Sequence, residues 1–172
     1  MMRLSDAFMN RSVLSLRTGS PVGLAIGPII DPNNLKIAGW HAKDLRQKGD
    51  FILPTGEVRE IITKGLVVND HDALTHPEDL VRLKPIIDIA FELVGKQVVN
   101  ERKRKIGKVT DYSVDNGFYV KKIYATPSLI RSLKSQQLVI DRDDILEVTD
   151  SKIVVREATV KSPSTVAQQV PA

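Results

Sequence analysis

The 172-residue chain contains no cysteine, which excludes disulfide bonds, thiolate nucleophiles and cysteine-ligated zinc sites. This absence fits a cytoplasmic protein, and we expect that location. No run of about 18 apolar residues occurs, so we expect no membrane span. Residues 1–6 begin no long apolar stretch of the kind that a secretory signal requires. Aromatic residues make up only 5% of the chain, so few large side chains are available to fill a core.

Positive charge is in small excess: the chain has 25 basic and 21 acidic residues, which gives a net charge of +4. The excess is local. Residues 96–122 hold eight basic and three acidic groups, whereas residues 141–157 hold six acidic and three basic ones. The densest run is Glu101–Lys105, with four adjacent cations. Such a run either attracts an anionic partner or is a solvated turn whose charges keep strands from aggregating.

The clearest internal pattern is a repeat. Val22–Asp31 aligns with Ile106–Asp115 at a constant offset of 84 residues, so that Gly23 meets Gly107. An offset of 80 residues is also possible, because it aligns Ile26 with Ile106. We prefer the offset of 84, because it also brings the following turns and strands into phase.

The match extends to the end of each repeat. At the offset of 84, Trp40 meets Tyr124, and further along the block Glu78–Leu83 resembles Asp143–Val148. This alignment leaves the first unit longer and predicts an insertion near residues 49–76. The resulting division is a first unit at 1–86, a second unit at 87–158 and a disordered tail at 159–172.

The local pattern is that of short β-strands joined by turns. Val98-Val99 and Ile106–Val109 are apolar or alternating, and the charged run between them reads as a turn. Helical signals are limited to Thr55–Ile62 and Pro127–Leu133, each long enough for one or two turns. The sequence therefore predicts a mainly β protein with a few short helices.

Two pairs of residues recur at matching positions and have structural explanations. Gly23 and Gly107 lie inside strand patterns, which predicts a bend or bulge where a small barrel turns a corner. Asp31 and Asp115 suggest paired catalytic carboxylates, but each comes just before a turn. An aspartate there accepts backbone N–H bonds and caps the turn, and we favour that interpretation.

The second unit contains a spaced motif of glycine, apolar and acidic residues. It reads Gly95-x2-Val98-x7-Ile106-Gly107-x-Val109-x-Asp111-x2-Val114-Asp115, with the block Asp143–Val148 downstream. This motif resembles the PRC-barrel family, and the first unit matches it more loosely. The resemblance implies two small PRC-type β-barrels in tandem with a few short helices.

The resemblance also implies a mode of action. Characterised PRC barrels bind larger partners and are not known as catalysts; one forms the C-terminal half of a bacterial ribosome-maturation factor. The implied function is a non-catalytic binding or scaffold protein whose partner is another protein. The alternative is a ribosome- or RNA-associated maturation or assembly factor that uses the basic hairpin at 101–105. The candidate partner-binding residues are Arg102, Lys103, Arg104, Lys105 and Lys108.

Residues suited to catalysis or metal binding are few. Asp70-His71-Asp72 with His76 suggests metal ligands, but zinc sites need three or four ligands at chelating spacings, and these residues are ordinary in a polar loop. No nucleophile-elbow, dinucleotide or P-loop motif occurs. We therefore expect no catalytic residue, metal or cofactor, and an enzyme using His71 and nearby acids is the weaker alternative.

The aromatic residues near the basic run bear on the choice of partner. Tyr112, Phe118, Tyr119 and Tyr124 follow it in the same unit. Exposed rings beside cations suit RNA backbones and bases. A small barrel, however, needs large side chains as fillers, so we expect most of these rings inside. Trp40 and Tyr124 are then core residues or contacts between the units.

Overall fold

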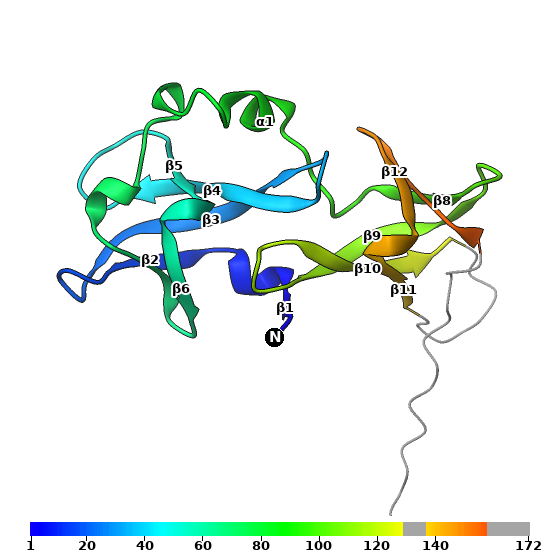
Figure 1. Ribbon diagram of the computed structural model, residues 1–172, viewed down its shortest axis with the longest axis horizontal. Helices are drawn as coiled ribbons and strands as arrows, with labels where there is room; N and C mark the ends of the chain where they lie inside the picture. Colours follow the sequence, from blue (N-terminus) through cyan, green and yellow to red (C-terminus); the bar gives the residue numbers. More distant parts are fainter. Residues whose placement is uncertain (129–136, 158–172) are drawn as a thin grey trace, which may run out of the picture. The chain divides into compact units, whose positions relative to one another are not determined.

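The computed structural model describes residues 1–128 and 137–157 (Figure 1). Most of the helix predicted at Pro127–Leu133 and the tail predicted at 159–172 lie outside these residues.

The chain forms two compact units. The first comprises Met1–Phe91 together with Asp115–Tyr119, and the second comprises Glu92–Val114 and the chain from Val120 onward. The sequence places the boundary earlier, after residue 86. The difference arises because the short helix that spans this point, α1, contacts strand β3 of the first unit.

The strands and helices are short throughout. The first unit contains β1 (Arg3–Leu4), η1 (Ser5–Phe8), β2 (Arg11–Ser15), β3 (Pro21–Asp31), β4 (Lys36–Asp44), β5 (Phe51–Pro54), η2 (Thr55–Glu57), β6 (Val58–Ile62), β7 (Gly65–Val68), η3 (His71–Ala73), η4 (Pro77–Asp79) and α1 (Lys84–Ile89). The second contains β8 (Gln97–Asn100), β9 (Lys105–Val114), β10 (Val120–Pro127), β11 (Leu138–Asp141), η5 (Arg142–Asp144), β12 (Ile145–Val148) and β13 (Lys152–Val155).

Each unit is built on one curled sheet of half-barrel form. The strand order is β5-β4-β3-β2-β7-β6 in the first unit and β11-β10-β9-β8-β13-β12 in the second. In both sheets one neighbouring pair is parallel, β2 with β7 and β8 with β13, and the other pairs along this path are antiparallel. The two sheets therefore share one topology, and the expected mainly β fold with two small barrel-like units and few short helices is confirmed.

Strand pairing settles the register of the repeat. Val13 pairs with Gly23 in the first unit, and Val98 pairs with Gly107 in the second, each next to a shift in register. The two glycines are equivalent, so the offset of 84 residues is confirmed over β3 and β9, and the offset of 80 is wrong.

In the next strand, the offset between equivalent residues of the two units becomes one residue smaller. Trp40 lies opposite Pro28, and the residue opposite Tyr112 at the matching position is Ile123. Trp40 therefore corresponds to Ile123, and its predicted match with Tyr124 is wrong. The cause lies between the last equivalent pairs: six residues separate Ile30 from Ile37, and five separate Val114 from Val120.

The predicted match between the ends of the repeats is also wrong. The counterpart of β12 is β6, because both follow a single 3-10 turn and both pair antiparallel with the last strand of their unit. Glu78–Leu83 instead contains part of η4 and no strand. The extra length of the first unit therefore follows β7, over residues 69–91, rather than forming an insertion near 49–76. The predicted helix at Thr55–Ile62 is one 3-10 turn followed by β6.

Large apolar side chains fill the interior of the first barrel. Trp40 is fully buried, its ring stacks on Phe8 at 6.4 Å between centroids, and it meets Phe118 edge-on at 5.8 Å. The indole Nε1–H donates to the Phe8 carbonyl oxygen at 3.1 Å, so the polar atom of this buried ring is also satisfied. The second barrel is filled by smaller side chains, among them Val98, Val109, Val114, Ile123, Ile140 and Ile153.

Gly23 and Gly107 occupy equivalent tight positions. A Cβ on Gly23 would lie 2.5 Å from the carbonyl oxygen of Lys43, and one on Gly107 would lie 2.5 Å from that of Thr126. In each case the obstacle is the backbone of the neighbouring strand, which cannot rotate away. The bend predicted at these glycines thus coincides with a close approach of two backbones.

We expect Gly23→Ala and Gly107→Ala each to lower the free energy of unfolding by about 1–3 kcal/mol, because the neighbouring strand must shift to admit the methyl group. Urea unfolding followed by circular dichroism measures the effect. Gly56→Ala is the control, since a Cβ at that position meets nothing within 4 Å. Equal stability of all three variants would contradict the close-approach explanation.

Candidate functional site

The basic turn, defined here as Arg102–Lys105, comprises most of the connection from β8 to β9 in the second unit and the first residue of β9. All four of its side chains are exposed, and Lys108 is exposed further along β9. The fold therefore brings four of the five predicted partner-binding residues into one turn and places the fifth on the adjoining strand.

A buried side chain holds the backbone of the basic turn. The Asn100 side-chain oxygen accepts from the backbone N–H of Arg102 and of Arg104, both at 3.0 Å. Asn100 itself is only 7% exposed, and Lys103 adopts a left-handed φ of 62°. The four cationic side chains are thus attached to a backbone of defined conformation.

Most of the charge of the basic turn is uncompensated. Arg102 pairs with Glu157, with Nε and Oε2 3.5 Å apart, and both side chains are more than half exposed. Lys103, Arg104 and Lys105 have no side-chain partner among the residues that the structure describes. Three cations are therefore available to an anionic group.

The aromatic residues do not form a stacking surface beside these cations. Tyr112 is 4% exposed, and burial, with a smaller effect of the Asp111 charge, raises the pKa of its hydroxyl well above the ordinary value. Phe118, Tyr119 and Tyr124 are half-buried. No aromatic side chain in the described ranges is exposed, but of these four rings only Tyr112 is buried, so the expectation that most of them lie inside is met only in part.

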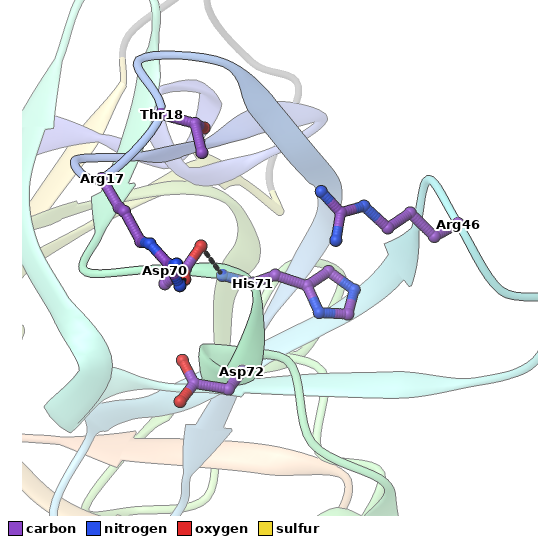
Figure 2. Close-up of a pocket in the computed structure, with 6 residues that line it drawn as sticks. All are labelled: Arg17, Thr18, Arg46, Asp70, His71 and Asp72. Atoms are coloured by element: carbon purple, nitrogen blue, oxygen red, sulfur yellow. Dashed lines mark hydrogen bonds and ion pairs between the residues drawn. The ribbon is translucent and has the colours of Figure 1, made fainter.

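A second feature is a pocket of about 440 Å³ on the first unit (Figure 2). Three segments line it: the turn between β2 and β3, the chain just after β4, and the chain after β7. The lining residues are Arg17, Thr18, Arg46, Asp70, His71 and Asp72. Both arginines and the histidine thus reach one place from segments that are far apart in sequence.

A buried carboxylate orients the histidine of this pocket. His71 Nε2 lies 2.6 Å from Asp44 Oδ2, and the Asp44 side chain is completely shielded from solvent. The other carboxylate oxygen of Asp44 accepts from the Arg46 backbone N–H at 2.7 Å. Because a carboxylate only accepts hydrogen bonds, Nε2 donates, and Nδ1 of the ring is left for other contacts.

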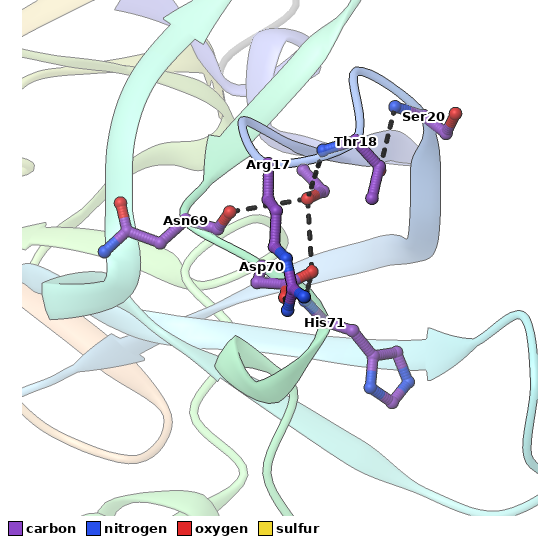
Figure 3. Close-up of polar contacts among 7 residues, drawn as sticks. Arg17, Thr18, Ser20, Asn69, Asp70 and His71 are labelled. Atoms are coloured by element: carbon purple, nitrogen blue, oxygen red, sulfur yellow. Dashed lines mark hydrogen bonds and ion pairs between the residues drawn. The ribbon is translucent and has the colours of Figure 1, made fainter.

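A network of polar contacts fixes the neighbouring Asp70 (Figure 3). Its carboxylate accepts from the His71 backbone N–H at 2.8 Å, from Arg17 at 2.8 Å and from the Ser15 hydroxyl at 3.2 Å. The His71 N–H first, and then the Arg17 guanidinium, hold the pKa of Asp70 below its ordinary value. Asp70 therefore compensates the charge of Arg17.

The turn beside the pocket is the counterpart of the basic turn. Leu16–Ser20 joins β2 to β3 as the basic turn joins β8 to β9. Ser15 and Asn100 occupy the same place in the parallel ladder of their sheets, and both are buried. The Ser15 hydroxyl oxygen accepts from the Thr18 backbone N–H at 3.3 Å. Ser15 therefore holds its turn by a side-chain hydrogen bond to the backbone, as Asn100 does for the basic turn.

The ion pairs of the two turns are equivalent as well. Arg17 lies two residues after β2, and Arg102 lies two residues after β8. Their partners are equivalent too, because Asp70 lies two residues after β7 and Glu157 two residues after β13. The same end of each barrel thus carries a braced turn with an arginine paired to an acid. The sequence pattern indicates only the second of these places.

The remaining candidate residues have structural contacts. His76 lies against the Phe51 ring at 4.6 Å between centroids. Within the described residues, no group of three or more His, Asp or Glu side chains is placed to hold a metal ion. His71, oriented by Asp44, is suited to hold or transfer a proton, but over residues 1–128 and 137–157 no hydroxyl group is hydrogen-bonded to its ring.

The recurring aspartates cap turns. Asp31 Oδ1 accepts from the Asn33 backbone N–H at 2.9 Å. Asp115 Oδ1 accepts from the backbone N–H groups of Gly117 and Tyr119 at 2.9 and 3.0 Å. This is the role that their position before a turn predicts.

The chain matches no family model and no curated protein. In the part of the chain that the structure describes, no helix is long and apolar enough to cross a membrane.

Proposed function

We propose that this protein is a non-catalytic binding protein that docks on an acidic segment of a partner protein through the basic turn. The observation that carries the proposal is the clustering of exposed cations on a backbone braced by Asn100. Because the turn is already ordered, binding an anionic segment costs little further backbone entropy.

The absence of exposed rings favours a protein over RNA as the partner. Binding of single-stranded RNA commonly uses bases stacked on aromatic side chains next to the cations. The aromatic residues that follow the basic turn in the sequence are buried or half-buried. A ribosomal or RNA partner is the second candidate, favoured by the density of cations in the basic turn, since phosphate contacts need no ring.

The family and location belong to the same proposal. Two sheets of one topology, each with a glycine at the equivalent bend, support the interpretation of both units as PRC barrels. The characterised barrels of that family bind partners, which agrees with a binding role here. We place the protein in the cytoplasm, in keeping with its lack of cysteine.

The test replaces Arg102, Lys103, Arg104 and Lys105 by glutamine in the full chain. The probes are a fluorescent peptide of eight glutamates and a single-stranded RNA of ten uridines, both titrated by fluorescence anisotropy at two salt concentrations. We expect the parent protein to bind the peptide in a salt-dependent manner, and the variant to bind about tenfold more weakly or worse.

A control with the same loss of charge makes the result specific. Lys64, Arg82, Lys84 and Lys121 are exposed and lie outside the basic turn. Their replacement by glutamine should leave peptide binding within about twofold of the parent value, since none of these residues belongs to the proposed binding site. Binding of RNA but not of the peptide would replace this proposal by the second candidate, and binding of neither would overturn both.

A further inference from the structure

The pocket of the first unit is lined by both hydrogen-bond donors and a hydrogen-bond acceptor. The Arg46 guanidinium has no partner among the described residues, and Figure 2 shows it directed into the pocket toward Thr18 and the His71 ring. Thr18 Oγ1 accepts from the Ser20 backbone N–H at 3.3 Å, which leaves its O–H free to donate. Arg46 and Thr18 therefore present donors to an anionic oxygen.

The acceptor of the pocket is Asp72. Asp72 also lines the pocket and has no partner in the described part of the chain. Arg17 contributes little, since Asp70 already compensates its charge at 2.8 Å. A ligand that fits must carry a negative oxygen and a hydrogen-bond donor next to each other.

An inorganic anion of high charge is less suited to this pocket than a carboxylate. Hydrogen phosphate offers oxygens to Arg46 and Thr18 and an O–H to an acceptor, but it brings up to two negative charges beside Asp72, whereas a carboxylate brings one. An acidic peptide meets both conditions, since a glutamate or aspartate side chain supplies the carboxylate and its amide N–H supplies the donor. The pocket also lies beside the counterpart of the basic turn, so the two units carry their candidate sites at the same place in the fold.

We infer that the pocket lined by Thr18, Arg46, His71 and Asp72 is a second binding site for an acidic peptide segment, so that one chain has two such sites, one in each unit. This inference rests on the proposed function for the chemistry of the ligand, and it adds the second site and its residues. Arg46 binds the carboxylate, Thr18 donates to the same group, and Asp72 accepts from the peptide N–H.

The experiment is a titration of the ¹⁵N-labelled full chain with blocked tetraglutamate, acetylated and amidated at its ends, followed by ¹H–¹⁵N correlation spectra. We expect two groups of amide signals to shift, one around Thr18, Arg46 and His71 and one around the basic turn. Arg46→Gln should weaken binding at the pocket about tenfold or more and leave the shifts at the basic turn unchanged. Lys48→Gln removes the same charge from an exposed residue two positions later and should leave both groups of shifts unchanged.

The outcomes separate this inference from the proposed function. Shifts at the basic turn alone would overturn the second site and leave the proposed function standing. Shifts at the pocket that inorganic phosphate reproduces at the same ionic strength would overturn the assignment to a peptide. Pocket shifts that persist at full affinity in Arg46→Gln would overturn the role of Arg46, and no shift in either unit would overturn both proposals.

Discussion

Replacement of Trp40 by alanine should lower the free energy of unfolding of the first unit by about 3–5 kcal/mol, the range measured when a buried large aromatic residue is truncated. Trp40 is fully buried, packs against Phe8 and Phe118, and donates its indole hydrogen bond to a buried carbonyl. Its removal leaves a cavity and an unsatisfied acceptor together. Amide hydrogen exchange measures the loss, because it reports on each unit separately.

Tyr124→Ala is the matched comparison, because it tests which residue is the counterpart of Trp40. Strand pairing assigns that place to Ile123, which is fully buried, whereas Tyr124 is half-buried. We expect Tyr124→Ala to destabilise the second unit much less than Ile123→Ala, for which the loss is about 2–5 kcal/mol. A larger loss for Tyr124→Ala would contradict the one-residue shift between the repeats.

Replacement of His71 by alanine should lower the free energy of unfolding by about 1.5–3 kcal/mol, the usual value for removing a hydrogen bond to a charged buried group. Asp44 is shielded from solvent, and without the ring its Oδ2 loses the partner that lies 2.6 Å away. The loss is limited because Oδ1 keeps the Arg46 backbone N–H. Chemical denaturation of His71→Ala gives the size of the effect.

A double-mutant cycle shows whether the effect belongs to this pair. In the Asp44→Asn background the buried charge is absent, so His71→Ala should cost clearly less than in the parent protein. Asp72→Asn, on the same 3-10 turn but exposed, should leave stability unchanged within error. If the losses of stability in the two single variants add up to the loss in the double variant, the 2.6 Å contact between His71 and Asp44 contributes no coupling energy.

Local patterns in the sequence predicted much of the fold. The apolar and alternating segments around the basic turn became β8 and β9, and the aspartates before turns became turn caps. Both predictions succeed because strand alternation and turn capping depend on residues within a few positions of each other. The repeat was visible over β3 and β9 for the same reason, since Gly23 and Gly107 meet the same steric condition.

The alignment of the repeats failed where it relied on composition alone. An acidic pair followed by apolar residues occurs at both Glu78–Leu83 and Asp143–Val148, yet only the second forms a strand. The true counterpart, β6, follows a 3-10 turn as β12 does, and it is recognised by its pairing with the last strand of the unit. A short pattern of this kind does not specify which strand it will pair with.

By itself, the sequence determined the β character of the chain, its duplicated core motif, its turns and the position of the basic turn, because all of these follow from near neighbours along the chain. Only the tertiary structure decided that Asp44 meets His71, that Arg46 and Thr18 face one pocket, and that Trp40 corresponds to Ile123. Asp44 and His71 are 27 residues apart, and their contact depends on how β4 and the chain after β7 are placed by the sheet. Strand register sets such contacts, and it results from the packing of the whole barrel rather than from any local pattern.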